Sequence, residues 1–190
     1  MQLIIQPIMV HGKGILDDFS FVIPPLLAAF RFEKDTSVMI NKAISQIPKE
    51  LCDSKRNQYQ SDHLLMWLQQ TFEPSASTKL LAVCDFDAYF GKYNFCFGEA
   101  IISGKISAIY LARLLPLHSN VDKKFLNLFQ DRIVKEAIHE IGHNFGLRHC
   151  SRDHCIMFKS RTISDTDKKN SEFCMSCIDP LAVSLKSPSN

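Results

Sequence analysis

The chain has 190 residues, of which 46% are hydrophobic and 22% are charged, and its formal net charge is +2. This length suits one domain with a substantial core, and the nearly neutral charge argues against nucleic-acid binding, which needs a concentrated basic surface. No apolar run is long enough to span a membrane, and the N-terminus lacks the basic segment and cleavage site of a signal peptide. We therefore expect a cytoplasmic protein that binds neither nucleic acid nor membranes.

The first part of the chain predicts two strands and two helices. Pro24 and Pro25 are tolerated only in the first turn of a helix, so a helix is expected to begin there. Ser61 or Asp62 is a suitable N-cap for the second helix. The expected elements are a strand at 2–8, a helix at 24–34, a strand at 38–40, an irregular segment at 44–57 and a helix from 61 or 62 to 72.

The second part predicts three strands and one long helix. An apolar run at 79–86 is bounded as a buried strand should be, and Ser103–Gly104 is expected to form a turn between strands at 95–102 and 107–114. Apolar residues at helical spacing then predict a helix that begins near Asn120 or Asp122. After Gly146 we expect irregular, polar chain apart from its cysteines, with a disordered tail from residue 186. The whole pattern predicts an α+β domain with a mixed twisted sheet.

The stretch His139–His149 carries a motif that makes sense around a metal ion. His139 and His143 are four residues apart, so they lie on the same face of a helix and can bind one ion together. Gly146 permits the left-handed backbone that ends a helix, which allows His149 to return as a third ligand. A fourth position then stays open for water, as in a catalytic zinc site. Glu140 follows the first histidine, and this position suits a carboxylate that acts on the metal-bound water.

The alternative interpretation of this stretch is an amphipathic helix that carries histidines on its polar face by chance. HExxH alone is a weak signal for that reason. The full HExxHxxGxxH fixes five residues at set offsets, and this favours the metal site strongly.

Four cysteines near the C-terminus predict a second metal site. Cys150, Cys155, Cys174 and Cys177 form two short-spaced pairs, which can close a four-thiolate zinc site with no room for water. The expected role is structural, because residues 151–190 contain few large apolar residues. Two disulfides or free thiols are the alternative, and His154 is a less favoured substitute for one cysteine. We expect two zinc ions, one catalytic and one structural.

The pattern HExxHxxGxxHC-x4-C-x-M…CxxC resembles the archaemetzincins, a branch of the metzincin zinc peptidases. Residues 85–89, 94–100 and 108–114 also resemble that family's sheet region, and residues 56–65 resemble the start of one of its helices. The resemblance implies a zincin fold of a single domain, 1–190. Residues 1–146 would form an upper subdomain with the sheet and zinc-binding helix, and residues 147–190 a four-cysteine subdomain below the cleft.

The resemblance also implies roles for particular positions. Met157 matches the methionine that packs in a tight turn beneath the histidines, although an ordinary core methionine would have nearly the same surroundings. One of the strands at 95–102 and 107–114 would be the edge strand that holds an extended peptide by backbone pairing. Glu99 is a weak candidate for substrate contact if its strand is that edge.

The sequence thus predicts a zinc-dependent metallopeptidase that acts on peptides or proteins, and we expect a monomer. Glu140 would take a proton from the zinc-bound water and pass it to the leaving amine. The alternative is a zinc-stabilised module that binds peptides or proteins and whose peptidase site is latent or inactive. Glu140 argues against that alternative, because a purely structural zinc needs no base.

Overall fold

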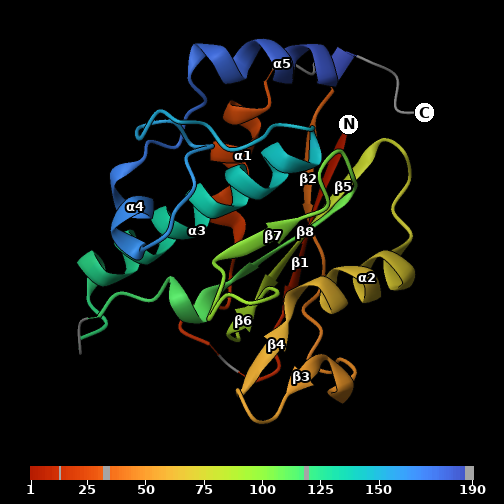
Figure 1. Cartoon of the computed structure of the whole chain (residues 1–190), viewed down its shortest axis with the longest axis vertical. Helices are drawn as coiled ribbons and strands as arrows, with labels where there is room; N and C mark the ends of the chain where they lie inside the picture. Colours follow the sequence, from red (N-terminus) through yellow and green to blue (C-terminus); the bar gives the residue numbers. More distant parts are fainter. Residues whose placement is uncertain (13, 32–34, 118–119, 187–190) are drawn as a thin grey trace.

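The computed structural model describes residues 1–12, 14–31, 35–117 and 120–186. A five-stranded sheet in the order β2-β1-β5-β8-β7 runs through the molecule (Figure 1). The elements in chain order are β1 (Gln2–Ile8), a 3-10 helix (Ser20–Val22), α1 (Ile23–Ala29), β2 (Ser37–Ile40), a 3-10 helix (Lys49–Leu51), β3 (Cys52–Asp53), β4 (Gln58–Gln60), α2 (Ser61–Phe72), β5 (Thr78–Cys84), β6 (Ala88–Tyr89), β7 (Gly98–Ala100), β8 (Ile106–Tyr110), a 3-10 helix (Leu111–Arg113), α3 (Lys123–Asn144), α4 (Ile163–Lys168) and α5 (Met175–Lys186).

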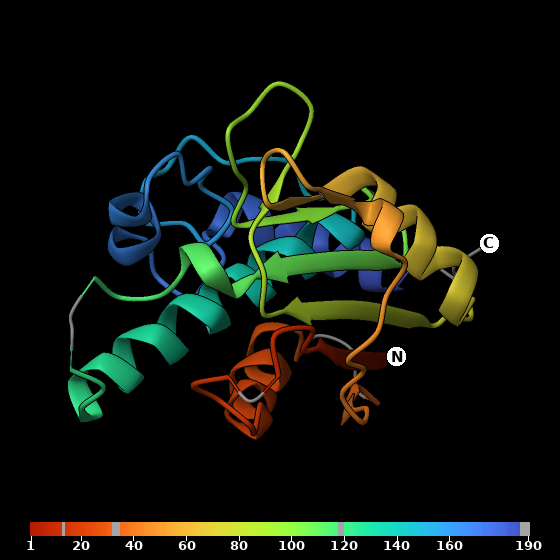
Figure 2. The ribbon, with the colours of Figure 1, turned by 90° about the horizontal axis from the view of Figure 1, so that it is seen from below.

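The sheet separates two hydrophobic cores because alternate residues of its central strands point to opposite faces. On β5, Leu81 and Val83 join the core that α1 and α3 cover, whereas Leu80 and Ala82 join the core that α2 covers. Figures 1 and 2 show α2 on the opposite side of the sheet from α1 and α3. The described ranges contain no helix with the length and apolar character needed to cross a membrane.

The expected mixed sheet is confirmed, because β7 pairs antiparallel with β8 while the other pairs are parallel. β7 lies at the edge of the sheet, so the expected edge strand falls within the predicted strand 95–102 and not within 107–114. Both strands are shorter than predicted: β7 covers only Gly98–Ala100, whereas β8 begins one residue before the predicted strand, at Ile106, and ends at Tyr110 because the chain turns into a 3-10 helix at Leu111.

The end of α3 is anchored to the β7–β8 turn. The backbone N–H of Ser103 donates to the carbonyl oxygen of His143 at 3.0 Å. The side-chain amide of Asn144 donates to the carbonyl oxygens of Ile101 and Ile106 at 3.1 and 2.9 Å. The backbone N–H of Gly104 donates to the carbonyl oxygen of Ile101 at 2.8 Å, which confirms the turn predicted at Ser103–Gly104. The bonds to α3 hold the edge strand beside the helix that carries the first two motif histidines.

Several predicted boundaries in the first part of the chain were wrong. The helix predicted at 24–34 is α1, which ends at Ala29, and residues 32–34 lie outside the described residues. The segment predicted as irregular at 44–57 contributes β3 to a small sheet in the order β3-β4-β6. Strands of two or three residues are too short to show a hydrophobic period, so the sequence did not indicate this second sheet.

The prediction that the chain is irregular after Gly146 was also wrong, because α4 and α5 form there. At α4, Thr162 and Asp165 form a capping box: Asp165 accepts from the Thr162 backbone N–H at 2.8 Å. In α5, Pro180 lies inside the helix, and a proline in a segment normally argues against a helix there. Cys177 and Leu181 of this helix are buried one turn apart. Of the tail predicted to be disordered, Lys186 ends α5 and residues 187–190 lie outside the described residues.

Candidate metal centre

His139 and His143 lie on the last turns of α3 and are both buried, with exposed fractions of 4% and 7%. Nδ1 of His139 lies 2.7 Å from the carbonyl oxygen of Ile156, and Nδ1 of His143 lies 2.6 Å from that of Leu147. The Nε2 atoms of the two rings face each other at 3.2 Å. Each imidazole is therefore oriented by a backbone carbonyl on one side and faces its neighbour on the other.

His149 joins this pair after the chain reverses at Gly146, which has a φ of +84° as its predicted left-handed role requires. The His149 ring centroid lies 5.4 Å from that of His139 and 4.8 Å from that of His143. One ring nitrogen from each of the three histidines lies within 4.8 Å of the other two. His149 is the exposed member of the group, so the cluster opens to solvent on its side.

All three imidazoles favour the neutral form. Burial is the main cause that lowers the pKa of His139, and the charge of Lys169 adds to it. Burial likewise lowers the pKa of His143. Partial burial of the His149 ring, with the neighbouring His143 and Lys159, lowers its pKa to about 4. Neutral imidazoles are the form that binds metal ions.

The geometry of the pair fits a bound cation. A neutral imidazole has one N–H, and in His139 and His143 it is directed to a carbonyl oxygen, which leaves a lone pair on each Nε2. Two lone pairs at 3.2 Å cannot form a hydrogen bond with each other. Tetrahedral zinc with Zn–N bonds of about 2.0–2.1 Å would separate two nitrogen ligands by about 3.3 Å. The separation of the two Nε2 atoms is therefore close to that expected for two ligands of one zinc ion.

Glu140 follows His139 on α3 and is also buried, with an exposed fraction of 4%. Burial raises the pKa of its carboxyl well above the usual value, the negative charge of Glu136 raises it further, and Lys169 opposes the shift. A carboxylate held in such surroundings is a stronger base than one in water.

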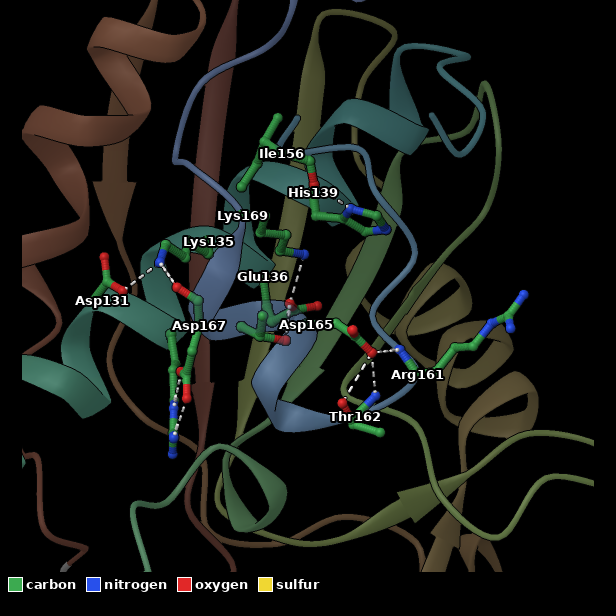
Figure 3. Close-up of polar contacts among 12 residues, drawn as sticks. Asp131, Lys135, Glu136, His139, Ile156, Arg161, Thr162, Asp165, Asp167 and Lys169 are labelled. Atoms are coloured by element: carbon green, nitrogen blue, oxygen red, sulfur yellow. Dashed lines mark hydrogen bonds and ion pairs between the residues drawn. The ribbon is translucent and has the colours of Figure 1, made fainter. Parts of the chain in front are cut away.

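A buried ion pair lies beside the histidines and was not predicted from the sequence. Nζ of Lys169 lies 2.8 Å from Oε1 of Glu136, and the two side chains are 0% and 3% exposed (Figure 3). The distance is that of an ion pair, although Nζ has no hydrogen bond of good geometry to any described residue. Thr166 donates to the same Glu136 oxygen at 3.1 Å. The pattern of a charge at 136 on the face of His139 and Glu140 was the only available signal.

Further polar contacts join α4 to α3 in the same region. Arg132 binds Asp167 through two nitrogens at 2.7 and 2.8 Å, and Nζ of Lys135 donates to the carbonyl oxygen of Asp167 at 3.2 Å. Figure 3 shows Lys135 close to Asp167, with His139 and Ile156 higher in the view. The segment after the motif is therefore held against α3 by charge as well as by apolar packing.

The four predicted cysteine ligands come together. The Sγ atoms of Cys150 and Cys174 are 3.8 Å apart, and those of Cys155 and Cys177 are 3.7 Å apart. These separations are far longer than a disulfide bond, and all four thiols are free. Zn–S bonds of about 2.3 Å would place two thiolates of a tetrahedral site about 3.8 Å apart. His154 is exposed and is not part of the cluster.

Met157 is fully buried beneath α3. A Cβ added to Gly142, which lies between the two motif histidines of the helix, would be only 2.7 Å from Sδ of Met157. The methionine therefore packs directly against the histidine-bearing turn, where the resemblance expected it.

Glu99 lies on the edge strand β7. Burial raises the pKa of its carboxyl to about 7, and a hydrogen bond from Ser61 opposes the shift. Its Oε2 is buried and makes no hydrogen bond within the described part of the chain.

The chain is similar to known peptidases over most of its length. The model of peptidase family M54 matches residues 34–182. The archaemetzincin of Sulfolobus acidocaldarius is 34% identical over 151 residues, which make up 79% of this chain and 83% of that protein.

Solved structures give the same result. The crystal structure of archaemetzincin from Methanopyrus kandleri has a TM-score of 0.81 and 26% identity, and the match covers 98% of this chain and 96% of that one. A zinc-dependent peptidase from Methanocorpusculum labreanum has a TM-score of 0.71 and 28% identity, with 94% and 99% covered. These similarities confirm the fold that the resemblance implied.

Proposed function

Because the chain belongs to peptidase family M54 and is, by that membership, a zinc metallopeptidase, we propose that His139, His143 and His149 hold its catalytic zinc and that Glu140 is its general base. The observation that carries the proposal is the pair of Nε2 lone pairs that face each other at 3.2 Å. A cation removes their repulsion, and the carbonyls of Ile156 and Leu147 keep both rings in the tautomer that zinc needs.

The catalytic steps that we assign to the chain are proton transfers at Glu140. Zinc, when bound, supplies a Lewis acid that lowers the pKa of a water molecule and polarises the substrate carbonyl. The Glu140 carboxylate accepts a proton from the attacking water and then donates it to the leaving amine. Its burial supports this role, because a carboxylate removed from bulk water binds a proton more readily.

The substrate of such a site is a peptide or protein in extended conformation. β7 lies at the edge of the sheet beside α3, so its outer backbone groups are available to pair with an added strand. Strand addition recognises the main chain of the substrate and places its carbonyls along the edge strand.

We also propose that Cys150, Cys155, Cys174 and Cys177 hold a second, structural zinc. The support is the set of thiol separations, which match a tetrahedral four-thiolate site. Burial raises the pKa of Cys155 and Cys177, whereas hydrogen bonds with the neighbouring thiols outweigh burial at Cys174 and lower its pKa to about 6. Cys174 is therefore the thiol of the cluster that gives up its proton first. Four filled positions leave none for water, which fits a structural role.

A binding module with a latent site is the second candidate, and the low exposure of His139 and Glu140, 4% each, favours it.

Digestion of a peptide library separates the two functions. We expect the wild-type protein to cleave peptides, a chelator to stop the cleavage, and Glu140→Gln to abolish it while catalytic zinc stays bound. Glu50→Gln makes the same chemical change at an exposed position and is the matched control. Cleavage by Glu140→Gln would refute the role of Glu140, and a wild-type protein that binds peptides without cleaving them would favour the binding module.

A further inference from the structure

Gly98 on β7 lies directly against the side chain of Glu140. A Cβ added to Gly98 would be 2.6 Å from Oε1 and 2.7 Å from Cγ of Glu140, and 2.9 Å from the carbonyl oxygen of Ala108. Real Cβ atoms essentially never approach other atoms within 3.0 Å. A glycine is therefore the only residue that lets the Glu140 carboxyl group lie where it does.

The backbone of Gly98 does not itself require glycine. Its φ lies outside the left-handed region, which is occupied by Gly12, Gly91 and Gly146 among the described glycines. Gly98 pairs with Ile109 in the regular β7–β8 ladder. A glycine weakens a strand, because it adds conformational freedom to the unfolded chain and has no side chain to pack. The space that it leaves is thus the feature that explains the residue, and Glu140 fills the closest part of that space while the carbonyl oxygen of Ala108 borders it.

We propose that Gly98 is a positioning residue for the general base, and this inference rests on the proposed role of Glu140. The missing side chain allows the carboxylate to lie against the edge strand at the place where a substrate strand would add. The base and the substrate-binding edge are then in van der Waals contact, so a peptide paired with β7 has its backbone beside Glu140.

The structure also indicates which group must move if a side chain is added at Gly98. Two of the three close atoms belong to Glu140, whose side chain can rotate, whereas the Ala108 oxygen belongs to the backbone of β8 inside the sheet. Gly98→Ala should therefore displace mainly the Glu140 carboxylate. A misplacement of about 1 Å in a catalytic group can reduce a rate about a hundredfold.

The test compares Gly98→Ala with Gly14→Ala, a position where an added Cβ meets no atom closer than 3.7 Å. We expect Gly98→Ala to lower kcat by about tenfold to a hundredfold, with a smaller change in KM and full zinc content, while Gly14→Ala keeps wild-type kcat. A kcat for Gly98→Ala within about twofold of wild type, or a loss of zinc that accounts for the loss of rate, would overturn the proposal.

Thermal unfolding supplies a readout that does not depend on activity. Gly98→Ala should lower the unfolding midpoint more in the wild-type background than in the Glu140→Ala background, because the second change removes the two closest atoms. Equal decreases of the unfolding midpoint in both backgrounds would show that an added side chain at Gly98 does not press on Glu140. Failure of the wild-type protein to cleave any peptide would instead refute the proposed function, and the unfolding comparison would still decide whether Gly98 makes room for Glu140.

Discussion

Nδ1 of His139 lies 2.7 Å from the carbonyl oxygen of Ile156, and Ile156 stands between Cys155 and Met157 in the chain. The backbone that orients a proposed ligand of the catalytic zinc is therefore continuous with a proposed ligand of the structural zinc. His149 and Cys150 are a second pair of neighbours divided between the same two sites. The two clusters are thus linked at two points of the chain.

This linkage predicts that Cys177→Ser impairs both zinc sites. Loss of one thiolate opens the four-cysteine site, which frees Cys155 and so the Ile156 carbonyl that orients His139. Loss of a hydrogen-bond partner that orients a ligand histidine typically lowers metal affinity by about tenfold to a hundredfold, and we expect a loss of that size at the histidine site. Metal analysis combined with chelator titration measures it. Cys52→Ser, outside the cluster, should change neither site, and unchanged affinity of the histidine site in Cys177→Ser would contradict the linkage.

The residues of the two proposed metal sites could be named from the sequence because metal binding depends on residue type and spacing. His139, His143 and Gly146 lie on or next to one helix, and local geometry alone determines how they are arranged. The edge position of β7, by contrast, depends on strand order, which is set by packing between distant segments. The family resemblance narrowed the choice to two strands, and the sequence held no further signal to decide between them.

The ion pair of Lys169 with Glu136 shows why other parts of the site escaped prediction. The two residues are more than thirty positions apart, and no spacing pattern relates one to the other. A lysine in a polar stretch is normally assigned to the surface. Only the docking of α4 against α3 buries Lys169 completely, so its environment follows from tertiary structure and not from local sequence.

Removal of the buried cation should destabilise the fold. Lys169→Met leaves the Glu136 carboxylate buried without its charge partner, and such single losses cost about 3–5 kcal/mol. We expect the double variant Glu136→Gln/Lys169→Met to recover part of the loss, because it removes the unpaired charge. Denaturant unfolding in excess zinc measures these differences in the free energy of unfolding. Lys168→Met changes an exposed neighbour and is the control; an equal effect at the two lysines would show that the ion pair contributes nothing.

The raised pKa of Glu99 predicts that the free energy of unfolding depends on pH. Burial raises the pKa of its carboxyl from 4.5 to about 7, so the folded protein holds this proton more tightly than the unfolded chain does. The resulting stabilisation is present below about pH 4.5, is lost as the pH rises to about 7, and changes no further above that value. Glu99→Gln keeps a neutral side chain at every pH. Its unfolding midpoint should therefore exceed that of the wild-type protein by a margin that grows between about pH 5 and 7 and is constant up to about pH 8.

The difference between the two proteins reports on Glu99 and on its effect on Glu140, because the Glu99 charge also raises the pKa of that carboxyl. The zinc sites and the exposed titrating groups are common to both proteins. Thermal unfolding of wild type, Glu99→Gln and the exposed control Glu50→Gln at matched pH values provides the measurement. A margin that is independent of pH would mean that Glu99 is already ionised in the folded protein. In that case its buried Oε2 must have a partner, such as an ordered water, that holds the charge.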